Sequence, residues 1–443
     1  MEKKSKILSY VSGASDKPLL FKTVWQILAE AADSHPEKQA LISHHQNRTL
    51  SYKELHEEAE KVANGLCNAG LQKGDRIGIW APNCIEWVLL QFASAKIGAI
   101  LVTINPAYRK NELKYALNKV QCKILVMASS FKTSDYVSMI NDIAPGIINE
   151  TGSDLNLQEL PNLKSIFIIN KDKNSKINSF ENLINLEEPS SLTDIILDPD
   201  EDINIQFTSG TTGSPKGATL THFNIVNNGF FVGEAMRFSD RDVLCVPVPL
   251  YHCFGMVMGI LTCVSHKATI VLPDYSFDPN TCLKAIDKYK CTAIHGVPTM
   301  FVAMLENSSF NNYSFDSLRT GIMAGAPCPI EVMKKVQSNM HVREMTIAYG
   351  MTETSPVSFQ SATDDPLERR VSTVGKVQPH IQVKIIDENG KVVARGTKGE
   401  LCTRGYSVMK GYWDDSDKTS EVLTDTGWMK TGDLAIIDDS GYG

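Results

Sequence analysis

Residues 203–222 read INIQFTSGTTGSPKGATLTH, and this stretch decides the fold class. Its first five residues, Ile203 to Phe207, have the apolar and β-prone character of a buried strand. After the strand, glycines let the backbone turn sharply and approach a ligand closely, while hydroxyl groups and a lysine supply donors. The stretch therefore predicts a loop that binds phosphate oxygens. The loop residues are Thr208, Ser209, Gly210, Thr211, Thr212, Gly213, Ser214, Pro215, Lys216 and Gly217.

Two other interpretations of this loop are weaker. A Walker loop needs a lysine directly after its last glycine, whereas Lys216 precedes Gly217. A flexible linker rich in serine and glycine needs neither the preceding strand nor the central Pro215–Lys216 pair. The phosphate loop is therefore the favoured interpretation.

The residues before the loop alternate helical and strand patterns, as an α/β unit does. Val24, Ile27, Leu28 and Ala31 form an apolar helical stripe. Ser51 and Glu54 form a capping box, which predicts a helix running to about residue 65. Residues 76–80 then read as a strand, so we expect mainly parallel sheets covered by helices.

The expected organisation is an extension over residues 1–22 and one large domain over 23–443. Within it we expect two βαβ-type subdomains, about 23–200 and 201–360, with surface connections over about 145–202 broken by a strand at 165–169. Residues 361–443 carry short β-prone runs between turn signals, which suits a small sheet or a distorted β-barrel. Further strands are expected at 243–248, 268–272, 292–295, 320–324, 383–386, 399–403 and 434–437.

Composition excludes several other classes. The net charge of −7 and the absence of a basic cluster disfavour nucleic acid as a partner. The longest apolar run is too short for a membrane helix, which needs about 20 residues. The ten cysteines form no C-x-x-C pair, which favours reduced intracellular thiols over disulfides or a zinc site. The sequence gives no indication of oligomeric state.

Three later motifs follow the loop in order. Residues 349–354 read YGMTET, residues 399–405 read GELCTRG with GYW at 411–413, and residues 431–434 read TGDL. Together with TSGTTGSPKG at 208–217, these motifs resemble those of the AMP-binding, adenylate-forming ligases, the acyl-CoA synthetases. The sequence between the motifs most resembles that of the medium-chain fatty acyl-CoA ligases. Examples are NPAY at 105–108 and PLYHC at 249–253. The resemblance covers about residues 9–443.

This resemblance implies a chemistry and a role for each motif. A carboxylate attacks the α-phosphorus of ATP in line with departing pyrophosphate, forming an acyl-AMP that then passes its acyl group to CoA. Lys216 and the loop hydroxyls are expected to hold the β- and γ-phosphates, and Thr352 to donate to the α-phosphate. Glu353, with Thr212, is the candidate ligand for Mg²⁺. The expected catalytic residues are Lys216, Thr352, Glu353 and His252.

The nucleoside contacts are expected from other residues of the motifs. Tyr349 presents its ring to adenine beside Gly350, and Gly325, Ala326 and Pro327 form the opposite wall. Asp433 accepts from two ribose hydroxyls because an ionised carboxylate is acceptor-only.

Each of the polar candidates has a simpler alternative. Asp433 could be a turn residue after a glycine, and Glu353 a solvated loop residue. His252 could be simply packed and hydrogen-bonded rather than the gate of an acyl pocket. Cys253 and Phe254 bring no acidic group to this region, which favours a plain acyl chain over an amino acid.

The function expected from the resemblance is therefore activation of a fatty acid, with fatty acid, ATP and CoA as the substrates. An acyl-AMP or aryl-acid ligase is the alternative within the same chemistry, and a non-catalytic nucleotide-binding form is the alternative outside it. Family members continue past the position of Gly443 into a hinge and a small mobile lid domain that carries a further lysine. Without that domain we expect binding of ATP or acyl-AMP with slow turnover.

The expected compartment is intracellular. The resemblance implies the mitochondrial matrix, whereas the amino terminus as given lacks a presequence pattern and favours the cytoplasm.

Overall fold

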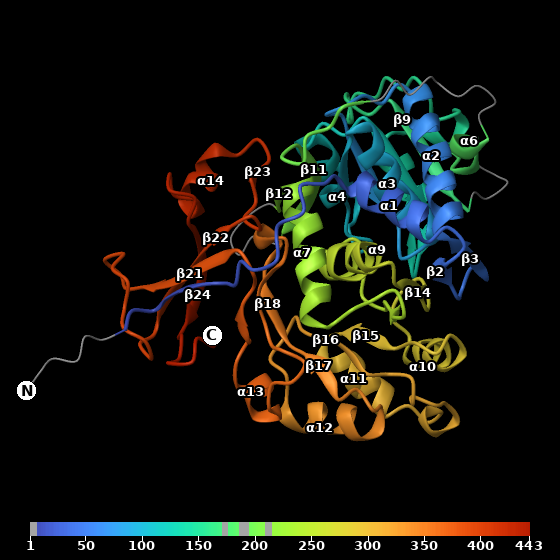
Figure 1. The fold of residues 1–443 in the computed structure, drawn as a ribbon. Helices are drawn as coiled ribbons and strands as arrows, with labels where there is room; N and C mark the ends of the chain where they lie inside the picture. Colours follow the sequence, from blue (N-terminus) through green and yellow to red (C-terminus); the bar gives the residue numbers. More distant parts are fainter. Residues whose placement is uncertain (1–6, 171–175, 186–194, 209–214) are drawn as a thin grey trace, which may run out of the picture.

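The computed structural model describes residues 7–170, 176–185, 195–208 and 215–443. Two large sheets with mainly parallel strands lie side by side, with helices packed around and between them (Figure 1). A smaller antiparallel sheet, orange to red in Figure 1 except for one blue strand from the start of the chain, lies to one side of both. This arrangement confirms the expected mixed α/β fold.

The first large sheet contains the strand that leads into the phosphate loop. Its order is β10-β9-β6-β4-β5-β11-β12-β23, and neighbours from β10 to β11 pair in parallel. The hairpin of β11 and β12 encloses the loop, and β23 adds to β12 antiparallel. The strands are β4 (Arg76–Trp80), β5 (Ile100–Thr103), β6 (Ile124–Ala128), β9 (Ser165–Ile169), β10 (Asn178–Ser179), β11 (Asp202–Thr208), β12 (Lys216–Thr221) and β23 (Gly411–Tyr412).

The second large sheet has the order β17-β16-β15-β13-β14-β2-β3, and only β3 runs antiparallel to its neighbour. Its strands are β2 (Gln39–Ser43), β3 (Arg48–Ser51), β13 (Val243–Cys245), β14 (Thr269–Leu272), β15 (Ala293–Gly296), β16 (Thr320–Met323) and β17 (Glu344–Thr346). A hairpin of β7 (Ser130–Phe131) and β8 (Ser134–Asp135) lies outside both sheets.

The two large sheets exchange strands across the expected boundary near residue 200. β2 and β3 come from the first half of the chain but pair in the second sheet, while β11 and β12 complete the first sheet. A buried strand must pair its backbone N–H and C=O groups with a neighbouring strand. The order of the strands in the sequence does not show which strand that neighbour is. The limits at 200 and 360 therefore stay a prediction about folding units.

Helices α1, α2, α3 and α7 form the apolar centre. Nearly every residue of α3 is buried, and α7 packs against a buried π-helical turn, Met256–Leu261, and against α9 (Figure 1). The helices are α1 (Val24–Ser34), α2 (Tyr52–Asn68), α3 (Ile85–Ile97), α4 (Lys110–Lys119), α5 (Tyr136–Ile143), α6 (Glu181–Ile184), α7 (His222–Ala235), α8 (Cys253–Gly255), α9 (Thr262–His266), α10 (Pro279–Lys288), α11 (Pro298–Leu305), α12 (Ile330–Asn339), α13 (Leu367–Ser372) and α14 (Ser416–Val422).

The small sheet has the order β1-β21-β22-β24, all antiparallel. In the described residues its outer strands are not paired with each other, so of the two expected forms the strands make the sheet rather than a closed barrel. A three-stranded sheet, β18-β19-β20, joins this region to the large sheets. The strands are β1 (Tyr10–Ser12), β18 (Ala348–Gly350), β19 (Val357–Gln360), β20 (Lys376–Val377), β21 (Ile381–Ile386), β22 (Gly399–Gly405) and β24 (Met429–Ala435).

Several local predictions are confirmed and others are wrong. The stripe of α1 is buried, the Ser51 capping box opens α2, and β4 and β9 have the expected bounds. The strand expected at 243–248 ends at Cys245. The strand expected at 434–437 is β24, which begins at Met429 because its pairing with β22 overrides the weak strand propensity of its glycine and aspartate. The segment expected to be surface connections also buries Leu155, Leu160 and Leu163.

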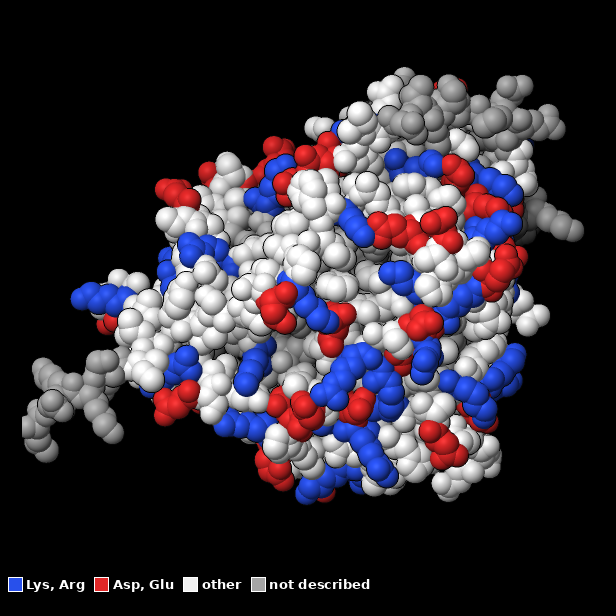
Figure 2. All heavy atoms as spheres, in the orientation of Figure 1, with Lys and Arg blue, Asp and Glu red and all other residues white. Residues whose placement is uncertain are grey.

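On the face shown in Figure 2, lysines and arginines are interspersed with acidic residues and do not form a patch of one sign. Within the described ranges, no helix is both long enough and apolar enough to cross a membrane.

Candidate functional site: a nucleotide cavity and an ion-binding cluster

A cavity of about 780 Å³ opens between the end of β16, strand β18 and strand β24. Its lining includes Gly325, Ala326 and Pro327 as well as Tyr349, Gly350 and Asp433. These are residues of three separate sequence motifs, so folding brings together the groups expected around adenine and ribose. Phe359 and Val374 also line the cavity, and no motif had indicated them.

Tyr349 and Asp433 contact each other at the wall of this cavity. The Tyr349 hydroxyl donates to Asp433 Oδ2 at 2.5 Å. Burial, together with the Asp433 carboxylate, raises the pKa of Tyr349 above its usual value, so the phenol stays protonated and remains a donor. Asp433 itself is exposed and accepts from Tyr349 through Oδ2, which leaves Oδ1 as an acceptor for a diol.

Two glycines shape the backbone around the cavity. A Cβ atom at Gly350 would lie 1.7 Å from the carbonyl oxygen of Pro356, so no side chain fits where the chain folds back after Tyr349. Gly325 follows β16 with a φ of +84°, a conformation that favours glycine. The cavity wall therefore requires glycine at both positions.

Lys216, Tyr412 and Glu353 form a second group, here called the ion-binding cluster. The Lys216 ammonium donates to the Tyr412 hydroxyl at 3.2 Å and lies 4.3 Å from the centre of its ring. The same hydroxyl donates to Glu353 Oε1 at 2.8 Å. Three motifs that are far apart in the sequence thus meet at one phenol oxygen.

The cluster is enclosed rather than solvated. Glu353 is 5% exposed and Tyr412 is 6% exposed, so the interpretation of Glu353 as a solvated loop residue does not fit the structure. Burial, with the Glu353 carboxylate next, raises the pKa of Tyr412 and keeps its hydroxyl protonated. The GYW motif at 411–413 resembles a motif of the family, but no role for its tyrosine followed from the sequence.

The backbone that carries Glu353 is held from two sides. Its carbonyl accepts from the N–H of Met409, next to the GYW motif, at 2.8 Å. Further on, the buried Asn228 amide on α7 donates to the Val357 carbonyl at 2.9 Å and accepts from the Val357 N–H at 3.1 Å. Asn228 thereby ties the segment after Glu353 to the central helix, and no motif had indicated it.

The tip of the phosphate loop, Ser209–Ser214 with Thr212, lies outside the described residues. Its two ends are placed by the hairpin of β11 and β12, where Thr208 pairs with Lys216. The Pro215 carbonyl accepts from the Tyr115 hydroxyl at 3.2 Å. The hairpin therefore brings the base of the loop to the ion-binding cluster.

Thr352 and Glu353 share a short 3₁₀ turn, Thr352–Thr354, three residues after Tyr349. The segment from Tyr349 to Glu353 therefore runs from the nucleotide cavity to the ion-binding cluster, so one strand end serves both.

His252 lies at the start of α8 and is not among the residues that line the nucleotide cavity. Its Nδ1 accepts from the N–H of Phe254 at 3.1 Å, so the ring caps the helix. One side of the residue is open to solvent, while the surrounding protein lowers its pKa by desolvation and favours the neutral ring. The next residue, Cys253, donates its thiol to Gln206 on β11 at 3.1 Å. The gating role of His252 stays a prediction.

The donor set fits a magnesium ion held mainly by its substrate. The described residues contain no group of three or more His, Cys, Asp or Glu side chains able to hold a metal. Mg²⁺ commonly binds through one or two carboxylates plus phosphate oxygens and waters, and Glu353 supplies one enclosed carboxylate. Glu353 could therefore hold the ion together with phosphate oxygens.

The chain belongs to the AMP-binding enzyme family, whose model matches residues 28–413. A putative acyl-CoA synthetase of Bacillus subtilis, YngI, is 42% identical over 430 residues, which are 96% of this chain and 78% of that protein. The human mitochondrial medium-chain acyl-CoA ligase ACSF2 is 39% identical over 445 residues, 98% of this chain and 72% of that protein.

The fold has the same support from a solved structure. A long-chain-fatty-acid-CoA ligase, FadD1 of Archaeoglobus fulgidus, aligns with a TM-score of 0.83 at 24% identity. The alignment covers 98% of this chain and 86% of that one.

Proposed function

We propose that the protein activates a fatty acid with ATP, forming an acyl-AMP, and then transfers the acyl group to CoA with release of AMP. The observation that carries the proposal is the convergence of two binding groups. The Tyr349–Asp433 pair lines a cavity of nucleoside size, and the segment after Tyr349 leads to the Lys216–Tyr412–Glu353 cluster. Family membership and the acyl-CoA ligases among its relatives support the same chemistry.

In this proposal the two groups divide the nucleotide between them. Adenine lies against the Tyr349 ring with Gly325, Ala326 and Pro327 opposite, and Asp433 accepts from the ribose hydroxyls. The phosphates extend toward Lys216 and the loop. Because the nucleoside and the terminal phosphates of ATP are both held, the α-phosphorus lies beside Thr352. There the carboxylate of a bound acid can attack it in line with the departing pyrophosphate.

Lys216 and Glu353 both serve to offset the negative charge of the phosphates, Lys216 directly and Glu353 through a metal ion. Lys216 neutralises phosphate charge that grows on the departing pyrophosphate, an electrostatic effect that is strong in an enclosed site. Glu353 would hold Mg²⁺ together with phosphate oxygens, and the ion would supply positive charge that offsets the charge of the phosphates. Tyr349 and Asp433 keep the nucleoside in place while the α-phosphorus exchanges its bond to pyrophosphate for a bond to the carboxylate.

The proposed acid is a medium-chain fatty acid. The relatives named for medium-chain acyl-CoA ligase activity support this choice, because they align along nearly the whole chain. The segment around Cys253 and Phe254 is buried and apolar and offers no carboxylate to an amino acid. An aryl-acid or acyl-AMP ligase remains the alternative to be tested with the same assay.

The test is acid-dependent exchange of labelled pyrophosphate into ATP. Straight-chain acids of increasing length, benzoate and an amino acid are compared on the same preparation, and hydroxylamine traps the acyl-AMP. We expect exchange that needs an acid and peaks among medium-chain acids, with an acyl thioester appearing when CoA is added. Exchange that peaks with benzoate would transfer the proposal to aryl acids, and no acid-dependent exchange or trapping would overturn it.

We also propose an intracellular site of action. The human relative is a mitochondrial protein by name, which supports an intracellular site, whereas the Bacillus subtilis relative comes from a bacterium and gives no support to the mitochondrion. Fractionation of cells that express the tagged gene product tests this. Recovery in the mitochondrial fraction would support the matrix, and recovery from the medium would contradict the proposal.

A further inference from the structure

We infer that Tyr412 is a positioning residue that keeps Lys216 and Glu353 apart, so that the ammonium stays available for phosphate and the carboxylate for its metal ion. The inference rests on the proposed function and concerns a residue whose side chain is expected to touch none of the three substrates.

The contacts at the phenol oxygen show how the separation works. A tyrosine hydroxyl has one proton to donate, and here it goes to Glu353 Oε1 at 2.8 Å. The Lys216 ammonium approaches the lone pairs of the same oxygen at 3.2 Å. The order of the hydrogen bonds is therefore fixed, because neither Lys216 nor Glu353 can exchange its role in this bridge.

Without the Tyr412 hydroxyl, the Lys216 ammonium and the Glu353 carboxylate would attract each other directly. Both lie within hydrogen-bond distance of one small atom, in surroundings that exclude water from Glu353. Opposite charges attract more strongly in such surroundings than in water. A direct Lys216–Glu353 ion pair would then compete with phosphate for the ammonium and with Mg²⁺ for the carboxylate.

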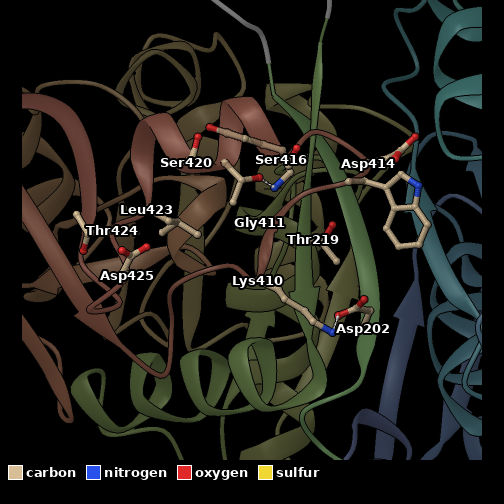
Figure 3. Close-up of a pocket in the computed structure, with 13 residues that line it drawn as sticks. Asp202, Thr219, Lys410, Gly411, Asp414, Ser416, Ser420, Leu423, Thr424 and Asp425 are labelled. Carbon is tan, nitrogen blue, oxygen red and sulfur yellow. Dashed lines mark hydrogen bonds and ion pairs between the residues drawn. The ribbon is translucent and has the colours of Figure 1, made fainter.

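The backbone of Tyr412 is anchored, as a positioning role requires. The N–H of Tyr412 donates to Thr419 Oγ1 on α14 at 2.9 Å, and that hydroxyl donates to the Asp415 carbonyl at 2.8 Å. Two residues before Tyr412, the Lys410 ammonium lies 3.0 Å from Asp202 Oδ1 on β11 (Figure 3). Strand β23 thus joins the first large sheet on one side and α14 on the other.

The ring has a separate task from the hydroxyl. Lys216 lies 4.3 Å from the ring centre, a distance at which the ring face attracts a cation. Tyr412→Phe removes the hydroxyl and keeps this contact, so it tests the separation alone. Tyr412→Ala removes both.

The experiment measures binding of a non-hydrolysable ATP analogue by calorimetry, once with Mg²⁺ and once with EDTA, and binding of AMP beside it. For the unaltered protein we expect Mg²⁺ to tighten binding of the analogue. In Tyr412→Phe we expect that gain to fall about tenfold, since a hydrogen bond to a charged group is lost, while AMP binding changes less than about twofold.

The matched control is Tyr52→Phe. The Tyr52 hydroxyl is also buried and donates to the Ala268 carbonyl at 2.6 Å, but Tyr52 stands at the start of α2, directly after the edge strand β3 of the second sheet. Its loss should lower the thermal midpoint and leave the effect of Mg²⁺ unchanged. A purely structural role of Tyr412 predicts the same pattern for both variants, and that result would overturn the inference.

Thr419→Val keeps the inference testable if Tyr412→Phe does not fold, because an unchanged effect of Mg²⁺ in Thr419→Val would contradict the inference. If Tyr412→Phe folds, it is also combined with Glu353→Gln. Glu353→Gln removes the charge that Tyr412 separates from Lys216, so Tyr412→Phe should add little to it, whereas independent effects would add and contradict the inference. Thr419→Val loosens the backbone of Tyr412 and should reduce the Mg²⁺ effect more weakly. If the unaltered protein binds no nucleotide, the proposed function fails instead.

Discussion

Replacing Asp433 with asparagine tests the ribose contact most sharply. Asparagine keeps the size of the side chain but removes the charge and places a donor where the carboxylate offered an acceptor. Asp433 accepts from Tyr349 at 2.5 Å, and its remaining acceptor capacity faces the cavity where we place the ribose hydroxyls. Tyr349 still has an amide oxygen to donate to, so the cavity wall should stay intact.

The expected magnitude follows from the hydrogen bonds lost. A hydrogen bond to a charged group contributes roughly 1.5–3 kcal/mol. Because Asp433 is exposed, solvent screening reduces its effect, and we expect a loss near the lower end for the two ribose contacts together. That loss is on the order of a tenfold weaker affinity for AMP.

The assay is calorimetry with AMP and with 2′,3′-dideoxy-AMP, which lacks both hydroxyls. Asp433→Asn should weaken AMP binding about tenfold and leave binding of the dideoxy compound nearly unchanged. Asp439→Asn, an exposed turn aspartate six positions further along, is the control and should change neither. Equal weakening of both nucleotides by Asp433→Asn would refute the ribose contact.

Three further predictions concern stability. Asn228→Ala leaves the N–H and carbonyl of Val357 unpaired and should cost about 2–4 kcal/mol in urea unfolding, and a cost below about 1 kcal/mol would contradict the clamp. Gly350→Ala should lower the thermal midpoint and weaken AMP binding because the Pro356 carbonyl must move; unchanged values would contradict the close approach. Burial lowers the pKa of His295 to about 4, so the unfolded chain binds this proton more readily, and stability is full above about pH 6.5 and falls toward pH 4. Unfolding at pH 7 and 5 should show His295→Gln losing about 2 kcal/mol less than the unaltered protein; equal losses would contradict this.

The sequence predicts those parts of the fold that depend on local pattern. The stripe of α1 and the capping box of α2 follow from residues a few positions apart, and both are as expected. The exchange of β2 and β3 into the second sheet depends on long-range pairing, which no local pattern encodes. The same holds for β24, whose start is set by its partner β22.

The candidate site divides in a similar way. The motifs predict contacts of Tyr349, Asp433 and Lys216 with adenine, ribose and phosphate, because residue types that suit these groups stand in fixed order. They give no role to Tyr412 and do not indicate Asn228, since a residue that acts on another side chain is recognised only when the two meet in space. Lys216 and Tyr412 are 196 positions apart in the sequence, so no local pattern indicates their contact.

The most direct test of the central claim is a crystal structure with a non-hydrolysable mimic of a medium-chain acyl-AMP. We predict adenine between the Tyr349 ring and Gly325–Pro327, the ribose hydroxyls on the Asp433 carboxylate, and the phosphate mimic on the side of Thr352 and Lys216. An adenine bound elsewhere, or a ribose that does not reach Asp433, would contradict the account.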